Sequence, residues 1–470
     1  MAAVVILTFL TCWLSWNVYV QANLYRELTT NELDYATYLK IGVISDLHLD
    51  GEQNSTGCPH MGYRGEITWH SHYNSTVYGA RGCDSSYGLV RHSIKSFYDK
   101  MLELGDTQFL VNIGDFSSHA EVSYEGTMES VKNITVLFAG EGTMLVPVYS
   151  VLGNNDMPVD YQEPELHRKF YREVWEQYRL LMRGRETRAA RESFERGGYY
   201  HINHAPNLDV IGLNTVAFSH KSNISREEVE AQFEWLEGAL EQARERGRGV
   251  ILLGHISPSV SQFQTEQVQW FREVMWREEH TARFVEIIDR YVDVLRISLF
   301  SHSHSFSWYV DVTKPVPPSY FVLSAISPLY ENEPSFHVLT VSPTWSLLDI
   351  WTYYTPLEFY TRQNLTPHFR FLFSLKEKFF DRPIENKDTV LSGSVLKAVT
   401  SKLIRPFDMQ RTFNTFTELG YQLAYLPAMI SPYKMYCILT QVSLTGIEDC
   451  LLSFGYSSIF PPNNGTDSTP

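Results

Sequence analysis

The chain has 470 residues, of which 44% are hydrophobic and 14% aromatic. This composition predicts a packed protein with one large core and a smaller domain, and it excludes a disordered chain. The net charge of −15 argues against a basic face that binds nucleic acid.

Residues 1–22 are apolar and end in the small-residue site Val20-Gln21-Ala22, which predicts a signal peptide removed after Ala22. An uncleaved signal anchor is the alternative. No later segment is expected to cross a membrane, and residues 461–470 form a polar tail. Glycosylation, and with it a lysosomal or extracellular residence, is predicted by sequons at Asn54, Asn74, Asn133, Asn223, Asn364 and Asn464.

Four cysteines remain once Cys12 leaves with the signal peptide. An even number of cysteines in an oxidising compartment predicts disulfide bonds. Proximity in sequence favours the pairs Cys58–Cys83 and Cys437–Cys450. One bridge with two buried free thiols is the alternative.

Five apolar runs predict buried strands, and each run is followed at once by polar residues. Because open α/β sheets hold their chemistry at the carboxyl ends of strands, we expect these polar side chains to line one site. In chain order they are Asp46 and His48, Asp115 and His119, Asn154 and Asn155, His255, and His302 and His304.

Other elements are predicted around these strands. Residues 51–88 form a long loop that we expect to line the site. Ser225 and Glu228 have the spacing of a capping box at the start of a helix. Helices are predicted over Leu89–Glu103, Glu165–Phe194, Ser225–Arg246 and Gln267–Tyr291, strands within Tyr320–Pro343 and Ser346–Tyr354, and a helical region from Leu357 onward.

Asp, His and Asn together form a ligand set suited to divalent metal ions. Asp46 and His48 are two residues apart, so on an extended segment both side chains reach the same ion. Gly114 permits a sharp turn before Asp115, whose carboxylate has the two oxygens needed to bridge two ions. The sequence therefore predicts a site for two adjacent metal ions.

The order Asp-x-His, Gly-Asp, Gly-Asn, Gly-His and His-x-His resembles that of the calcineurin-like metallophosphoesterases. Gly114 to His119, Gly254 to Pro258 and the pair Cys83-Asp84 are similar to the acid sphingomyelinase-like branch, which includes endopolyphosphatases. The resemblance covers Leu39 to Tyr354. It implies an α/β fold, a metallophosphoesterase β-sandwich of two mixed sheets flanked by helices over residues 23–356, with a C-terminal helical domain over residues 357–460.

The resemblance also implies roles for the polar residues. One ion, commonly zinc in the family, would be held by Asp46, His48, Asp115 and His304. The second would be held by Asp115, Asn154, His255 and His302, with Asp115 as the bridge. A bridging hydroxide would attack phosphorus, His119 would protonate the leaving group, and Asn155 or His119 would neutralise charge on the phosphoryl oxygens.

Three positions depart from the family pattern. Asn155 stands where many relatives have a histidine, and the run Gly153 to Asp156 is similar to that of endopolyphosphatases. Ser301 replaces a glycine, which we expect to tighten the local backbone without removing a ligand. Ser257 replaces a proline and leaves His255 intact.

We therefore expect a monomeric hydrolase of phosphodiesters, acting on a phospholipid head group or a nucleotide phosphate. An endopolyphosphatase that cleaves phosphoanhydrides is the alternative, and a non-catalytic metal-binding protein is the third hypothesis. The apolar stretch from Tyr421 to Leu439 would allow transient contact with a membrane surface, although core packing is the favoured interpretation.

Overall fold

The computed structural model describes residues 38–51, 58–61, 67–70, 77–121, 123–141, 146–258, 260, 274–330, 332–379, 388–404 and 432–455. For residues 58–61, 67–70, 432 and 444 it describes the backbone alone. The predicted signal peptide, the polar tail and the sequons at Asn54, Asn74 and Asn464 lie outside the described residues.

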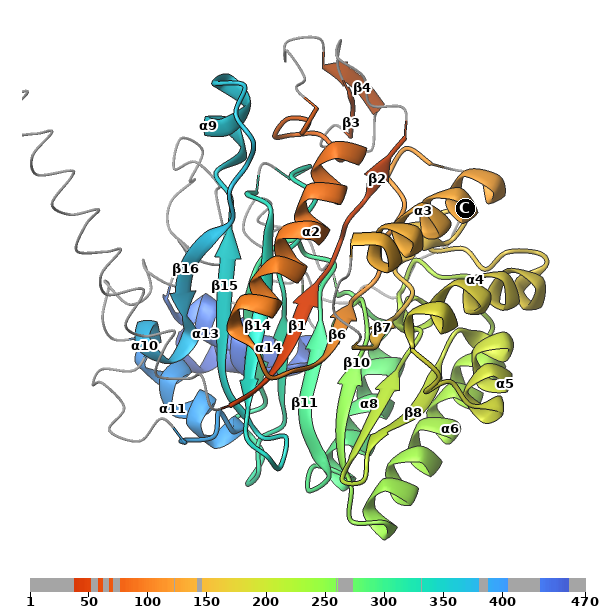
Figure 1. Ribbon diagram of the computed structural model, residues 1–470. Coiled ribbons are helices and arrows are strands. Elements are labelled where there is room, and N and C mark those ends of the chain that lie inside the picture. The colour runs from red at the N-terminus through yellow and green to blue at the C-terminus, as the bar shows by residue number, and fades with distance from the viewer. Residues whose placement is uncertain are drawn as a thin grey trace, which may run out of the picture.

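The first large sheet has six strands and is mixed (Figure 1). Strands β1, β6 and β7 run parallel, whereas β14, β15 and β16 join them in antiparallel pairs. In spatial order the strands are β16 (Arg370–Ser374), β15 (Leu347–Tyr354), β14 (Ser335–Val341), β1 (Leu39–Ile44), β6 (Thr107–Asn112) and β7 (Val148–Ser150).

The second large sheet also has six strands and is also mixed. Strands β9, β10, β11 and β13 are parallel, and β8 and β12 close the two edges in antiparallel pairs. In spatial order the strands are β12 (Ser307–Val310), β13 (Ser319–Val322), β11 (Leu295–Phe300), β10 (Gly249–Leu253), β9 (Leu208–Gly212) and β8 (Tyr200–Ala205).

One hydrophobic core joins the two sheets. It takes apolar side chains from both, such as Val43 and Val111 from the first and Ile251 and Leu299 from the second, all fully buried. Such burial on both faces explains why the strands are near-continuous apolar runs in the sequence. The predicted fold class, two mixed sheets flanked by helices, is confirmed.

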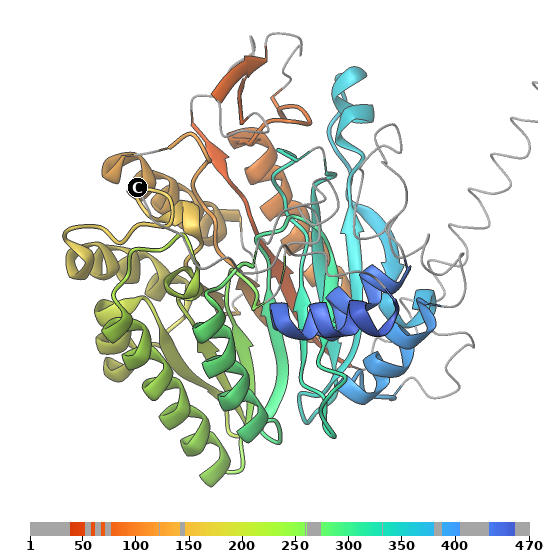
Figure 2. The same ribbon diagram turned by 180° about the vertical axis from the view of Figure 1, so that it is seen from behind.

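Helices cover the outer faces of both sheets. Figure 1 shows α2 crossing the first sheet, and Figure 2 shows α6 and α8 over the second. The helices and 3-10 turns up to β11 are α2 (Tyr87–Leu104), α3 (Tyr124–Glu141), η1 (Asn154–Asp156), α4 (His167–Leu181), α5 (Arg188–Gly197), η2 (Thr215–Phe218), α6 (Arg226–Glu245) and α8 (Glu278–Arg290). The segment predicted to be a long loop contains β3 (Cys58–Met61) and β4 (Ile67–His70), which pair in a small sheet, and β5 (Ser85–Ser86), which pairs with β2 (Leu49–Asp50) just before the segment.

The helix predictions are confirmed in part. The capping box of α6 is present: the hydroxyl of Ser225 accepts from the backbone N–H of Glu228, whose carboxylate accepts from the N–H of Ser225. The single helix predicted over Glu165–Phe194 is wrong, because α4 and α5 are separate. Gly184 has φ +78° between them and Thr187 caps the second, so the chain turns although the apolar periodicity continues.

The region from Leu357 onward contains a strand as well as helices. Strand β16 pairs with β15 and so extends the first sheet, because the edge of β15 offers unpaired backbone groups. The helices are α9 (Leu357–Arg362), α10 (Leu375–Phe379), α11 (Gly393–Lys402), α13 (Pro432–Thr440) and α14 (Leu444–Ser453). Among the described residues, no helix combines the length and apolar character that crossing a bilayer requires.

The disulfide Cys437–Cys450 joins α13 to α14, as predicted. Helix α13 lies beside β12, at the edge of the second sheet, and α14 packs against α13 (Figure 2). Cys83 is also disulfide-bonded, but the side chain of its predicted partner, Cys58, lies outside the described residues.

Candidate metal centre

The seven predicted metal ligands follow five strands that belong to two different sheets. In the first sheet, β1 ends just before Asp46 and His48, β6 before Asp115, and β7 before Asn154. In the second sheet, β10 ends just before His255, and β11 before His302 and His304. All seven are buried except His302, which is partly buried. The structure therefore brings the carboxyl ends of both sheets to one centre.

One group of side chains surrounds Asp46. The Nε2 atoms of His48 and His304 are 3.1 Å apart, and they lie 3.9 Å and 3.6 Å from Oδ1 of Asp46. Nε2 of His48 is also 3.4 Å from Oδ2 of Asp115. The ligand atoms of Asp46, His48 and Asp115 lie within 4.8 Å of one another, as do those of His48, His304 and His119, so each set could contact one ion.

A second group shares Asp115 with the first. Nε2 of His255 is 3.0 Å from Oδ2 of Asp115, and the rings of His255 and His302 meet edge to face at 5.2 Å between their centroids. The three ligand atoms that Asp115, His255 and His302 offer lie within 4.8 Å of one another. Asp115 is thus placed between two adjacent groups of ligands.

The backbone at these ligands is strained. Five non-glycine residues of the centre have a positive φ, which side chains with a Cβ rarely adopt: Asp46, His48, Asp115, His302 and His304. Close packing adds a second constraint at Gly153, where a Cβ would lie 2.0 Å from Oδ1 of Asp115. Such strain concentrates at functional sites, where the surrounding structure holds it in place.

Two buried oxygen atoms of the centre are suited to cations. Oδ1 of Asp46 and Oδ1 of Asn154 are buried and accept no hydrogen bond from any described residue. The amide nitrogen of Asn154 donates to Oδ1 of Asn155 at 2.9 Å and to Oδ1 of Asp160 at 2.8 Å, so the carbonyl oxygen is free to bind an ion. A buried oxygen without a partner is costly, and metal coordination would remove that cost.

The histidine tautomers suit metal binding. Nδ1 of His48 donates to the carbonyl of Ser117 at 2.9 Å, and Nδ1 of His255 donates to the carbonyl of Ile113 at 2.6 Å. A carbonyl only accepts hydrogen bonds, so the neutral form of each imidazole has its lone pair on Nε2, toward the centre. Burial lowers the pKa of His48, His302 and His304 well below its ordinary value, which keeps these imidazoles neutral.

The two carboxylates create a demand for positive charge. Burial raises the pKa of Asp46 to about 6. Burial alone would lower the pKa of His255, but Asp115 and Asp46 outweigh it and raise the pKa to about 9. Asp46 and His255 thus bind protons more readily than usual, and metal ions would compete with those protons.

Asp156 and Ser301 position the ligands, and sequence reasoning missed both roles. The carboxylate of Asp156 accepts from the backbone N–H groups of Gly153, Asp115 and Phe116 at 2.8, 2.9 and 2.6 Å, which joins the loops after β6 and β7. The hydroxyl of Ser301 contacts Oδ2 of Asp46 and the carbonyl of Leu323. Only the position of Ser301, directly before His302, hinted at such a role.

His119 lies at the edge of the centre, where its ring stacks on that of His48 at 4.1 Å. Asp84 holds it: the backbone N–H of His119 donates to the carboxylate at 2.8 Å, and Nδ1 lies 3.1 Å from it. Burial disfavours the charged imidazolium, but the charge of Asp84 more than compensates, so the pKa of His119 is raised. Nε2 is 3.4 Å from the hydroxyl of Tyr330.

The segment after η1 supplies further residues that the sequence did not single out. Asp160 accepts from the amide of Asn154, and the hydroxyl of Tyr161 is 3.2 Å from Nε2 of His302. The ammonium of Lys221 lies 5.0 Å above the ring of Tyr161. Asn155 also belongs to this side of the centre, where its backbone N–H donates to Oδ1 of Asp115 at 2.9 Å.

A family model and the similar proteins found by comparison agree on one family of phosphoesterases. Residues 39–306 match the calcineurin-like phosphoesterase family. Human cyclic GMP-AMP phosphodiesterase SMPDL3A is 26% identical over 339 residues, which cover 68% of this chain and 71% of the relative. Sphingomyelinase phosphodiesterase D of Dictyostelium discoideum is 23% identical over 391 residues, covering 80% and 81%. Human acid sphingomyelinase-like phosphodiesterase 3b is 23% identical over 444 residues, covering 88% and 90%.

Proposed function

This chain belongs to the calcineurin-like phosphoesterase family, and we propose that it hydrolyses phosphodiester bonds at the candidate metal centre. Membership of this family implies divalent metal ions. The observation that carries the proposal is the meeting of two ligand groups around Asp115, with unpartnered oxygens of Asp46 and Asn154 beside it. The names of its relatives, all phosphodiesterases, support the same reaction class.

We propose zinc as the metal, because imidazole and carboxylate are its usual ligands. Asp46, His48, Asp115 and His304 would hold one ion, and Asp115, Asn154, His255 and His302 the other. Two such ions supply an activated water and neutralise charge on the phosphoryl oxygens.

The protein side chains would handle the leaving group. His119 is suited to donate a proton from Nε2, because Asp84 holds Nδ1 and raises the pKa of the imidazole. Asn155 has its backbone tied to Asp115 and its Oδ1 occupied by Asn154, so its amide N–H is the group left to face a phosphoryl oxygen.

An endopolyphosphatase is the second candidate, and Lys221 is the observation that favours it. Its ammonium lies over Tyr161, beside His302, where a second phosphate of a polyanion would find a cation. The run Gly153 to Asp156 carries less weight than the sequence suggested, since the carboxylate of Asp156 is occupied by backbone N–H groups.

We also propose that the protein passes through the secretory pathway. The disulfide Cys437–Cys450 requires an oxidising compartment to persist. The side chains at the predicted sequons Asn223 and Asn364 are exposed, and that of Asn133 is partly exposed, so all three are open to glycosylation.

The test is hydrolysis by the purified, glycosylated protein with zinc. A chromogenic phosphodiester, a cyclic dinucleotide, sphingomyelin in detergent micelles and long-chain polyphosphate would be compared side by side. Asp115→Asn serves as the blank, because it removes the carboxylate shared by both ligand groups. If the wild type hydrolyses a diester and Asp115→Asn does not, the result supports the phosphodiesterase function.

Hydrolysis of polyphosphate and of no other substrate would show that the protein is an endopolyphosphatase, the second candidate. No turnover of any substrate, by protein that carries two zinc ions per chain, would contradict both candidates. That outcome would leave the chain as a metal-binding protein without hydrolase activity.

A further inference from the structure

A second cluster of possible metal ligands lies outside the candidate metal centre. Glu163, His167 and Glu228 each offer one ligand atom, and the three atoms lie within 4.8 Å of one another. They come from three parts of the chain: the loop after η1, the start of α4 and the first turn of α6. None of them belongs to the two groups around Asp115.

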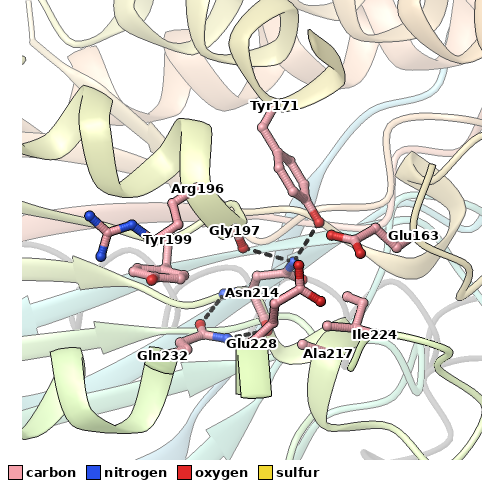
Figure 3. Close-up of a pocket in the computed structure, with 10 residues that line it drawn as sticks. All are labelled: Glu163, Tyr171, Arg196, Gly197, Tyr199, Asn214, Ala217, Ile224, Glu228 and Gln232. Atoms are coloured by element: carbon pink, nitrogen blue, oxygen red, sulfur yellow. Dashed lines mark hydrogen bonds between the residues drawn. The ribbon is translucent and has the colours of Figure 1, made fainter. Parts of the chain in front are cut away.

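The two carboxylates of this cluster lack a strong cationic partner. Within the described part of the chain, neither Glu163 nor Glu228 forms an ion pair with Arg or Lys, and Nδ1 of His167 is 3.9 Å from Glu163. Arg196 lines the same pocket, but Figure 3 shows its guanidinium at the far side, beside Tyr199. Burial and the nearby charge of Glu228 raise the pKa of Glu163.

An independent observation comes from Asn214, which lines the same pocket. It is fully buried, and its Oδ1 has no hydrogen-bond partner among the described residues. The rest of the residue is held firmly: Nδ2 donates to Gly197 and to the hydroxyl of Tyr171, and the backbone pairs with Gln232 on both sides. A rotation of the amide that would give Oδ1 a partner is therefore opposed by the two hydrogen bonds that Nδ2 donates.

The carboxyl groups converge on this amide. Figure 3 shows the carboxylates of Glu163 and Glu228 pointing into the pocket next to the side chain of Asn214. One carboxylate oxygen of Glu228 is occupied by Ser225 in the capping box, which fixes the side chain and leaves the other oxygen for a ligand. A pocket lined by two carboxylates and by Asn214, whose buried oxygen has no partner among the described residues, favours a cation, and His167 supplies an imidazole within reach of both carboxylates.

We propose that Glu163, His167 and Glu228 bind a third divalent ion of the zinc class, at the pocket that Asn214 lines together with the two carboxylates. Two ligands of a tetrahedral zinc ion lie about 3.4 Å apart, given bond lengths near 2.1 Å. The cluster has atoms within 4.8 Å, so side-chain rotation is sufficient to close it. The imidazole favours a transition-metal ion over calcium, which takes oxygen ligands.

This ion would fix the segment that leads back to the candidate metal centre. Glu163 is two residues from Tyr161 and three from Asp160, which contact His302 and Asn154. The backbone N–H of Glu163 also donates to Oδ1 of Asn223, and the amide of Gln162 donates to the carbonyl of Lys221. A cation between the starts of α4 and α6 would thus hold this segment in place from outside the centre.

The test measures zinc content and thermal unfolding of the full-length protein after removal of metal by a chelator. Glu163→Gln and Glu228→Gln keep the side-chain shape, and Gln at the third helical position still caps α6. Glu227→Gln is the matched control, since Glu227 is exposed in the same first turn. Asp115→Asn removes the shared carboxylate of the other centre and so tests whether the third ion is independent of it.

We expect one zinc ion fewer per chain in Glu163→Gln and in Glu228→Gln than in the wild type, and no loss in Glu227→Gln. Asp115→Asn should retain one ion, and the double variant with Glu163→Gln none. In metal-free buffer the Gln variants should unfold at or above the wild-type temperature, because they remove the repulsion between two carboxylates. Zinc should then raise the wild-type midpoint by roughly 3–5 °C more than theirs.

An equal zinc content in wild type and Glu163→Gln would overturn the proposal. So would an Asp115→Asn protein that binds no zinc, or a loss of zinc in Glu227→Gln. These outcomes are independent of the hydrolase assays, because they do not require activity.

Discussion

The hydroxyl of Ser301 orients Asp46, one of the proposed metal ligands. Ser301 stands where the family pattern has a glycine, and its hydroxyl contacts Oδ2 of Asp46 across the boundary between the two sheets. Oδ2 also accepts from Ser45 at 2.5 Å, so both hydrogen bonds hold one oxygen and leave Oδ1 for the metal. Groups that orient a ligand in this way raise its affinity for the ion.

Ser301→Ala should therefore weaken zinc binding by about 10- to 100-fold, because Asp46 loses one of the two groups that orient it. Competition with a chromogenic chelator measures this affinity. Ser303→Ala is the control, since the hydroxyl of Ser303 contacts Ser305 and no ligand. Equal affinity in wild type and Ser301→Ala would show that Ser45 alone suffices.

His119→Ala should lower the turnover number by about 10²- to 10⁴-fold while the zinc content stays at the wild-type level, because a proton donor is lost and no ligand is. Asp84→Asn should shift the pH profile toward lower pH, because the carboxylate that raises the pKa of His119 is gone. Kinetics and elemental analysis on the same samples measure both effects. If zinc is lost with His119, the imidazole is a ligand, as its place beside His48 and His304 would permit.

At the scale of elements, the proposed ligands follow the strands, whereas another buried histidine lies within a strand and outside the ligand groups of the centre. His337 lies in β14, fully buried, with Nε2 near Ser324 and Nδ1 3.0 Å from the hydroxyl of Thr352. Burial lowers the pKa of His337 to about 3. The folded protein thus holds a neutral imidazole over a pH range in which an unfolded histidine is protonated.

This difference makes stability depend on pH. Because the pKa of His337 is lower in the folded state than its usual 6.5, the stabilisation is complete above pH 6.5 and is lost as the pH falls toward 3. Between pH 7 and pH 5 the loss is about 2 kcal/mol. His337→Gln should remove this part of the pH dependence, as measured by urea unfolding at both values.

His368→Gln is the matched control, because His368 is exposed. A pH dependence that is the same in wild type and His337→Gln would mean that other groups dominate the acid sensitivity.

At the scale of the whole molecule, the candidate metal centre lies where the strand ends of the two sheets meet, and α13 lies against β12, at the edge of the second sheet. Contacts between the sheets run through the centre itself: the N–H of Ser327 donates to the carbonyl of Asp46, and His255 to that of Ile113. Helices α13 and α14 form a small apolar cluster with Val260, and α13 also packs against β12 and contributes Met435, Ile438 and Leu439 to the main core. No described side chain of α13 or α14 belongs to the ligand groups around Asp115, so we expect the loss of their disulfide to leave the centre intact.

Cys437→Ser with Cys450→Ser should lower the stability of the α13–α14 pair by about 3 kcal/mol, the chain-entropy effect of a short disulfide loop. Limited proteolysis should cut this pair sooner, while zinc content and turnover stay at the wild-type level. Loss of zinc in this variant would contradict the separation between the C-terminal helices and the centre.

The sequence determined the parts of the protein that depend on local chemistry. Buried strands are continuous apolar runs in the sequence, and polar residues follow directly after them. The order of residues alone therefore predicted Asp46, Asp115, Asn154, His255 and His302 as site residues. The capping box of α6 and the pair Cys437–Cys450 were predictable for the same reason, since each involves residues close in the chain.

Only the tertiary structure decided which distant residues meet. Ser301 reaches Asp46 and Asp156 joins two loops because the ends of the strands meet at these points, and no spacing in the sequence encodes that meeting. The strand β16 forms because the edge of β15 is open to it, although its own region has a helical pattern. Glu163, His167 and Glu228 likewise converge because the fold as a whole brings the starts of α4 and α6 together.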